Sequence, residues 1–181
     1  FQDPYESLNP KQSIFSIVQE PLMVHKIPLS PSQRRTRVLE ALESVALTPA
    51  SDYIDRYPHE LSGGQRQRIS VARALILHPE FMVADEPVSM LDVSIRAEIL
   101  NLLLNLREEL GLTYLFITHD LAVATYIADR IGIMYLGKIV EIGPAHDVAF
   151  EPLHPYTRAL ISAVPSGDPT VKRRIESLKG E

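Results

Sequence analysis

The chain has 181 residues, of which 45% are hydrophobic and 23% charged, and its formal net charge is −5 at pH 7. This composition is typical of a globular domain with a buried core. The acidic balance argues against general nucleic-acid binding, which usually needs a basic face. The absence of cysteine excludes disulfides, thiolate metal sites and thiol catalysis.

The first half of the chain is predicted to be mainly helical. Residues 1–12 have the prolines of a loop, and residues 13–57 have a helical pattern. Within that pattern, Ser30 and Pro31 are a capping residue followed by a proline at the first helical position. The segment "RQRISVARALILH" (66–78) is predicted to be a second strong helix.

The second half alternates between strands and helices. The short apolar runs "FMVA" and "TYLFIT" are typical of strands buried on both faces. A helix is expected at about 93–110 between them, and a shorter helix at 121–129 follows. The segments "RIGIMYL" and "KIVEI" are expected to form a hairpin at the sheet edge, and "PYTRALISAV" a final helix. This order predicts an α/β fold, with a parallel sheet covered by helices and an all-helical portion ahead of it.

Two adjacent carboxylates, Asp85 and Glu86, follow the first predicted strand. Ligands of parallel α/β sheets bind beyond the carboxyl ends of the strands. In a phosphoryl-transfer site the first carboxylate can hold Mg²⁺, and the second can orient or deprotonate a water molecule. An isolated Asp-Glu pair more often forms an acidic turn that faces solvent. Pro87 keeps the pair out of a helix in either case.

A second polar pair, His119 and Asp120, follows the second strand. A histidine at this place can donate a hydrogen bond to a phosphate oxygen. Taken alone, it is more often a satisfied core or capping residue, and Asp120 can equally be a helix N-cap. The six histidines show no paired spacing typical of a metal site.

The segment "LSGGQ" (61–65) precedes the second strong helix and places Ser62 at its N-cap position. A helix N-terminus presents unpaired N–H groups and partial positive charge, so it suits an anion. The missing Cβ atoms of Gly63 and Gly64 allow another surface to approach the backbone. A simple loop before a helix explains the two glycines equally well.

A second glycine-containing stretch, "GIMYLGK" (132–138), matches the spacing of a phosphate loop. Ile139 replaces the hydroxyl residue that such a loop uses for Mg²⁺, and the residues between the glycines have the pattern of a strand. We predict a hairpin here, and therefore no Walker A motif in this chain.

Together these segments resemble the ATP-binding subunit of ATP-binding cassette (ABC) transporters. The segment "LSGGQRQRISVARAL" is similar to the signature motif and helix, "FMVADEP" to the Walker B strand, "SMLD" to the D-loop, "THD" to the switch histidine and "FQDP" to the Q-loop. A narrower resemblance to the ATPases of oligopeptide and dipeptide importers rests on "FQDPYESLNP", "EPL", "LDVSI" and "HPYTRALISAVP". Met90 stands where the family usually has alanine, a departure that we expect to be tolerated.

The resemblance implies a partial P-loop NTPase (RecA-like) parallel-sheet core with an ABC-type helical subdomain and a short C-terminal extension. The implied segments are a Q-loop segment (1–10), a helical subdomain that ends in the signature helix (11–78), a catalytic α/β core (79–148) and an extension of the oligopeptide-importer type (149–181).

The resemblance also implies the roles of single residues. Gln2 would contact Mg²⁺ or the attacking water and sense the membrane subunits, Asp85 would hold Mg²⁺ through water, and Glu86 would act as general base. His119 would contact the γ-phosphate of ATP, and Asp92 would reach across a dimer interface. The implied residues that bind ATP held by the opposite subunit are Ser62, Gly63, Gly64 and Gln65, with Ser62 and Gly64 at the γ-phosphate.

The implied partners are a second ATP-binding subunit, in a homodimer or heterodimer, and two transmembrane permease subunits. A periplasmic or extracellular solute-binding protein would act indirectly, and no nucleic acid is expected. These partners imply a location at the cytoplasmic face of the cell membrane, with the helical subdomain docked on a permease.

The Walker A loop of the family lies upstream of the Q-loop, where this chain starts without an initiator Met. We therefore expect a fragment of a longer subunit, one that alone binds ATP weakly and does not hydrolyse it. Exposed strand edges and apolar faces would favour its self-association.

Two other functions are compatible with the sequence. The chain could serve as a docking and dimerisation piece without catalysis. It could also come from a non-transport ABC ATPase of DNA repair or translation, which the "HPYT" tail and the acidic balance disfavour. Nickel and oligosaccharide importers share the motifs of this subfamily, so the sequence does not identify the solute.

Overall fold

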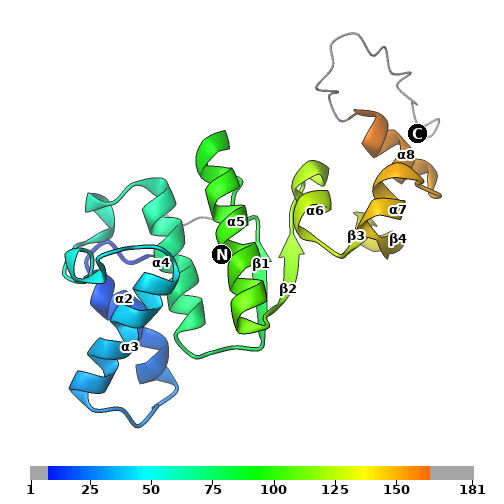
Figure 1. Ribbon diagram of the computed structural model, residues 1–181. Helices are drawn as coiled ribbons and strands as arrows, with labels where there is room; N and C mark the ends of the chain where they lie inside the picture. Colours follow the sequence, from blue (N-terminus) through cyan, green and yellow to red (C-terminus); the bar gives the residue numbers. More distant parts are fainter. Residues whose placement is uncertain (1–7, 164–181) are drawn as a thin grey trace. The chain divides into compact units, whose positions relative to one another are not determined.

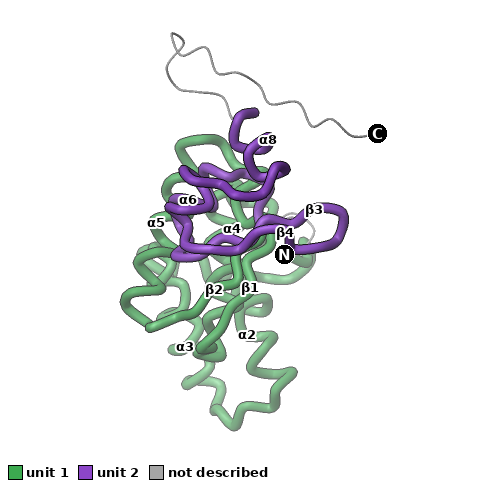
Figure 2. The backbone as a smooth tube through the Cα atoms, turned by 90° about the vertical axis from the view of Figure 1, so that its right-hand side faces the viewer, with its two compact units in different colours: residues 1–117 green, residues 118–181 purple. Residues whose placement is uncertain are grey.

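The structure is a computed structural model that describes residues 8–163. The chain divides into two compact units, with the boundary between Ile117 and Thr118 (Figure 2). Among residues 8–163 we find no helix with the length and hydropathy of a membrane span.

The first unit begins with a cluster of three helices. Helices α2 (Ile14–Val24), α3 (Pro31–Ser44) and α4 (Gly63–Leu75) pack against one another (Figure 1). Two short 3-10 helices, η1 (Ala50–Asp52) and η2 (Pro58–Glu60), lie between α3 and α4. The buried apolar side chains of this cluster include Ile14, Ile17, Val18, Leu22, Val38, Leu42, Ile54, Ile69 and Val71. Their removal from water is the main stabilising contribution to this part of the fold.

Serine side chains begin all three helices. The Ser13, Ser30 and Ser62 hydroxyls accept hydrogen bonds from N–H groups three residues further on. The predicted helix start at Ser30 is confirmed, with a glutamine side chain that completes a capping box. This helix ends at Ser44, because the backbone turns at Val45 and Ala46.

The first unit continues as a β-α-β unit of β1 (Phe81–Asp85), α5 (Val93–Leu110) and β2 (Thr113–Ile117). The strands pair in parallel, with Phe81 opposite Thr113 and Asp85 opposite Ile117. The predicted bounds of the helix are confirmed, and Gly111 ends it with a φ of +65°. Because the strands are parallel and in register, their carboxyl ends meet at the same edge of the sheet.

One face of this sheet is largely exposed. The side chains of Phe81, Val83, Leu115 and Ile117 are 45–55% exposed. The other face lies against α5, where burial raises the pKa of Tyr114 to about 12, against the opposing effect of Arg107. The prediction that both strands are buried on both faces is therefore wrong for the described part of the chain, because helices cover one face. The exposure agrees with the expectation of uncovered apolar strand faces.

The second unit contains α6 (Leu121–Ile127), β3 (Arg130–Tyr135), β4 (Lys138–Pro144), α7 (Ala145–Phe150) and α8 (Pro155–Ala163). Strands β3 and β4 form the predicted antiparallel hairpin, joined by Leu136 and Gly137 with φ values of +45° and +77°. They make a two-stranded sheet of their own and do not extend the β1-β2 sheet in the described residues. The side chains that form this small core are Ile131, Ile133, Ala145 and Val148, with Leu121, Tyr156 and Leu160 packed against them.

A carboxylate on the hairpin holds the start of the last helix. Glu141 of β4 accepts hydrogen bonds from the N–H groups of Leu153 at 2.8 Å and His154 at 3.1 Å. Burial opposes ionisation of Glu141, but these two hydrogen bonds, the Thr157 side chain and the His154 imidazole outweigh it and lower the pKa of the carboxyl. The ring of Tyr156 stacks on Tyr135 of β3, with 4.2 Å between ring centres. The "HPYT" segment is thus tied to the hairpin by its main chain and by an aromatic contact.

Candidate functional site

The predicted carboxylate pair lies at the carboxyl end of β1. Asp85 is the last residue of the strand, and Glu86 opens the turn that follows. The N–H of Glu86 donates to the carbonyl oxygen of Ile117 at 2.9 Å, and the Glu86 carbonyl accepts from the Ser89 hydroxyl at 3.0 Å. Main-chain bonds to β2 and to the turn therefore fix the position of this residue.

Glu86 has a φ of +45°, in the left-handed region. Residues other than glycine adopt this conformation at a cost of about 1–3 kcal/mol, and they concentrate at functional sites. The two residues after it, Pro87 and Val88, are buried, and Asp85 and Glu86 are half-buried. The pair is therefore partly shielded from solvent at the start of this turn.

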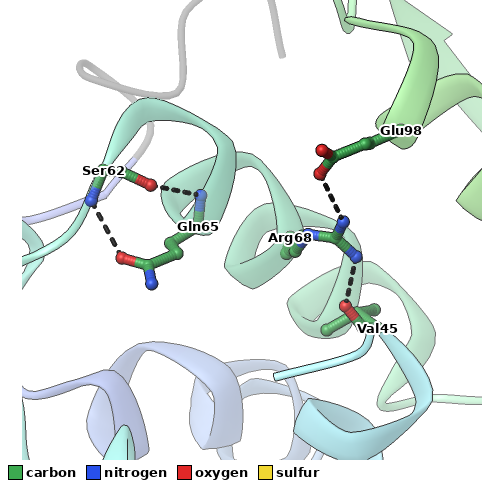
Figure 3. Close-up of polar contacts among 5 residues, drawn as sticks. All are labelled: Val45, Ser62, Gln65, Arg68 and Glu98. Carbon is green, nitrogen blue, oxygen red and sulfur yellow. Dashed lines mark hydrogen bonds and ion pairs between the residues drawn. The ribbon is translucent and has the colours of Figure 1, made fainter. Parts of the chain in front are cut away.

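The "LSGGQ" segment forms the start of α4, as expected (Figure 3). The Ser62 hydroxyl accepts from the N–H of Gln65 at 3.3 Å, and the Gln65 side-chain oxygen accepts from the N–H of Ser62 at 3.0 Å. The first main-chain bond of the helix joins the N–H of Arg66 to the Ser62 carbonyl at 2.9 Å. The N–H groups of Gly63 and Gly64 precede this bond, so they belong to the set of donors that a helix leaves unpaired at its start.

The capping box leaves hydrogen-bonding capacity on both side chains. A serine hydroxyl that accepts one hydrogen bond can still donate its proton, and a glutamine that accepts through its oxygen keeps its two N–H donors. Ser62 is exposed and Gln65 is half-buried. The start of α4 therefore offers main-chain and side-chain donors, together with the partial positive charge of the helix end.

Helix α5 lies beside the start of α4. A Cβ atom placed on Gly64 would be 2.7 Å from Cγ2 of Ile95. One turn further along each helix, the Arg68 guanidinium lies 3.3 Å from the Glu98 carboxylate and also donates to the Val45 carbonyl at 2.9 Å (Figure 3). The surface that approaches Gly64 is thus another helix of the same chain.

Asp92 is the residue before α5. It is exposed, and its side chain makes no capping hydrogen bond to the helix. Its carboxylate is therefore not needed for the start of the helix, unlike the side chain of Ser62.

His119 lies in the second unit, two residues beyond β2, and its side chain is exposed. The next residue, Asp120, caps α6 by accepting from the N–H groups of Ala122 at 2.9 Å and Val123 at 3.3 Å. Gln2 lies outside the described residues. The structure thus places Asp85 beside Glu86, and Gly64 against Ile95 of α5, the helix that follows Asp92.

Within residues 8–163, no three histidine, aspartate or glutamate side chains are grouped as a ready-made metal site. Mg²⁺ does not require such a group, since it usually binds one or two carboxylates together with substrate phosphates and water. A half-buried aspartate at the end of β1 fits that kind of ligand set.

Several contacts at the site were not anticipated from the sequence. The Arg66 guanidinium donates to the Leu61 carbonyl at 2.9 and 3.1 Å, which fixes the residue before the cap. Ile95 and Glu98 contact α4 from a helix that begins about thirty residues later in the chain. The sequence feature that pointed to these contacts was the pair of arginines, Arg66 and Arg68, in the first turns of α4. One sequence does not show which carbonyl or carboxylate groups these arginines contact.

Comparisons with known proteins agree with these observations. A family model described as ABC transporter matches residues 1–89, and one described as oligopeptide/dipeptide transporter, C-terminal region, matches residues 140–181. The chain is 54% identical over 173 residues to the oligopeptide transport ATP-binding protein OppF of Bacillus subtilis (strain 168), which covers 96% of this chain and 56% of the relative. It is 51% identical over 181 residues to the dipeptide transport ATP-binding protein DppF of Haemophilus influenzae, which covers 100% of this chain and 54% of that relative.

Solved structures show the same likeness. The ATP-binding cassette MJ0796, in a dimeric post-hydrolysis state bound to ADP and Pi, matches with a TM-score of 0.68 and 34% identity, over 80% of this chain and 61% of that chain. The protein cbiO1 of Clostridium perfringens, part of the ABC transporter complex cbiONQ, matches with a TM-score of 0.71 and 29% identity, over 82% and 57% of the two chains.

The chain belongs to the ABC transporter family of ATP-binding proteins, and it has the P-loop NTPase fold of its cassettes. It spans about half the length of the curated relatives that it matches.

Proposed function

We propose that these residues form part of the ATP-hydrolysing subunit of an ABC importer for oligopeptides or dipeptides. The observation that carries the proposal is the carboxylate pair at the end of β1, where Ile117 of β2 fixes Glu86. The names of the relatives, oligopeptide and dipeptide transport ATP-binding proteins, support the class of solute.

In this proposal each site residue has a separate task. Glu86 takes a proton from the attacking water at its carboxylate, and its fixed main chain keeps that carboxylate in place. Asp85 would hold Mg²⁺ through water, His119 would contact the γ-phosphate, and Gln2 would contact Mg²⁺ or the attacking water. Bound Mg²⁺ neutralises negative charge on the phosphate oxygens. The residues that hold ATP of an opposite subunit are Ser62, Gly63, Gly64 and Gln65, and Asp92 reaches across the dimer.

The partners follow from the same proposal. A second ATP-binding subunit completes each nucleotide site, and two permease subunits carry the solute across the membrane. The subunit works at the cytoplasmic face of the cell membrane, and a solute-binding protein delivers the solute on the other side. Contact between the helical subdomain and a permease is supported by exposed apolar side chains near the end of α2. These are Met23 and Val24 in its last turn and Ile27 after it.

The test uses the complete subunit, in which these residues are part of a chain as long as the relatives. We expect Mg²⁺-dependent ATP hydrolysis that Glu86→Gln abolishes, and peptide uptake that needs the same carboxylate when the permeases are present. The matched control is Glu80→Gln, which alters an exposed glutamate at the start of β1. Equal hydrolysis by the Glu86→Gln variant and the unchanged subunit would contradict the proposal.

The 181-residue chain by itself is proposed to bind ATP weakly and not to hydrolyse it, because it contains no Walker A motif. The exposed apolar face of β1 and β2 supports its self-association. Turnover by the purified chain that disappears in Glu86→Gln would contradict the first statement. A monomer that is stable on dilution, measured by light scattering, would contradict the second. A subunit that docks and dimerises with no hydrolysis at full length would instead be a non-catalytic module.

A further inference from the structure

Glycine at position 64 has an explanation inside its own chain. A Cβ atom at this position would lie 2.7 Å from Cγ2 and 3.7 Å from Cδ1 of Ile95. Cγ2 is bonded directly to the Cβ of a β-branched side chain, and its position on a helix is nearly fixed. An alanine at position 64 therefore requires a shift at this contact, either of the two helices away from each other or of the Ile95 side chain out of its preferred rotamer.

A second contact fixes the same two helices one turn further on. Arg68 is four residues after Gly64, and Glu98 is three residues after Ile95, and their side chains form an ion pair at 3.3 Å. Residues three and four apart on a helix lie on one face. Near these contacts, α4 and α5 therefore run in the same direction, with their starts side by side.

The two helix starts carry the residues proposed to face another subunit. Ser62 lies two residues before Gly64, and Asp92 lies three residues before Ile95. Both are exposed. A displacement of the start of α4 that preserves the tight contact must therefore displace Asp92 with it.

We propose that Ile95 is a positioning residue that joins the "LSGGQ" helix start to the segment of Asp92, so that the two act as one rigid body in ATP hydrolysis. This inference rests on the proposed function. In it, Gly64 offers its main-chain N–H to the nucleotide, while the absence of its Cβ serves the contact with α5. The competing explanation is that a Cβ at Gly64 would obstruct the nucleotide itself.

The two explanations separate in paired substitutions on the complete subunit. Gly64→Ala should lower kcat by about 100-fold, as small displacements of a reacting geometry do. Ile95→Ala in the same chain removes Cγ2 and Cδ1, and it should restore kcat to within about threefold of the Ile95→Ala variant alone. Ile95→Val is the matched control, since it keeps a γ-methyl group in place and should give no rescue.

Kinetics are measured well below the unfolding temperature of every variant, so that a change in stability alone does not alter kcat. Failure of Ile95→Ala to rescue Gly64→Ala, or rescue by Ile95→Val to the same degree, would overturn the inference. Thermal unfolding without nucleotide gives an independent reading. Gly64→Ala should lower the unfolding temperature, Ile95→Ala should remove that loss, and Ile95→Val should not. If the unchanged subunit hydrolyses no ATP, the proposed function fails, whereas the unfolding series still decides whether Ile95 and Gly64 are in steric contact.

Discussion

The N–H of Glu86 donates a 2.9 Å hydrogen bond to the carbonyl oxygen of Ile117, which joins the turn after β1 to the last residue of β2. The position of the proposed general base is therefore set by its main chain. Its N–H donates to Ile117, its carbonyl accepts from the Ser89 hydroxyl, and its backbone conformation is left-handed. Its carboxylate can be changed without loss of these bonds.

Glu86→Gln is expected to separate chemistry from folding. Glutamine has the same length as glutamate, and the substitution leaves the main-chain bond to Ile117 in place. The unfolding temperature of the complete subunit should therefore stay close to that of the unchanged protein. Loss of the general base should lower ATP hydrolysis by at least about 100-fold. Phosphate release and thermal unfolding measured on the same preparation check both statements, and a large fall in unfolding temperature would count against them.

Ser62 has two roles that a control serine can separate. Ser62→Ala and Ser30→Ala each remove a helix cap in a capping box completed by glutamine, and each should cost about 1 kcal/mol of stability. Only Ser62→Ala is expected to weaken ATP hydrolysis as well, because Ser30 begins a helix with no proposed nucleotide contact. Denaturant unfolding and hydrolysis rates of both variants make the comparison. Equal rates would remove Ser62 from the proposed site.

Arg68 is expected to stabilise the structure more through its hydrogen bond to Val45 than through its ion pair with Glu98. The Arg68 side chain is 16% exposed and the Glu98 side chain 61% exposed. Arg68→Met keeps the apolar stem but loses the bond to the Val45 carbonyl, and should cost about 1.5–3 kcal/mol. Glu98→Gln weakens only an exposed ion pair, and should cost less than about 1 kcal/mol. Denaturant unfolding measures both costs, and an equal loss in the two variants would show that the ion pair dominates.

Glu141 should make the attachment of α8 sensitive to acid. Its pKa is lower in the folded chain than its ordinary value of 4.5, so the folded state binds fewer protons and gains stability above that pH. This contribution is lost as the pH falls through the lower, folded-state pKa. Glu141→Gln should therefore lower the unfolding temperature at pH 7, with a difference that shrinks below pH 4.5. Glu151→Gln, at an exposed position near α8, is the control and should show no such convergence.

Local chemistry made much of the fold predictable. The starts at Ser30, Ser62 and Asp120 depend on side chains that bond to N–H groups two or three residues away, and such contacts are written in short segments of sequence. Gly111 and Gly137 end a helix and close a hairpin for the same local reason, a positive φ. Helix α7 was not anticipated, since its six residues are too few to show a periodic pattern.

Contacts between distant segments were not predictable from one sequence. The strand pattern in "FMVA" shows apolar side chains on both faces, but it does not show which face the described chain covers. The approach of Ile95 to Gly64 and the hydrogen bond that Glu141 accepts from the N–H of Leu153 depend on how separate elements pack. The residue types at the candidate site were readable from motifs, whereas the contacts that hold them in place required the structure.

The two-stranded sheet also has a consequence for amide hydrogen exchange. The N–H of Thr113 bonds to the Glu80 carbonyl and the N–H of Glu86 to the Ile117 carbonyl, so alternate N–H groups of each strand point at the other strand. In β2 the amides of Leu115 and Ile117 should exchange slowly, and those of Tyr114 and Phe116 fast. Slow exchange at all four would show that a further strand occupies the outer edge of β2. Exchange rates at four consecutive amides thus report whether this sheet is complete.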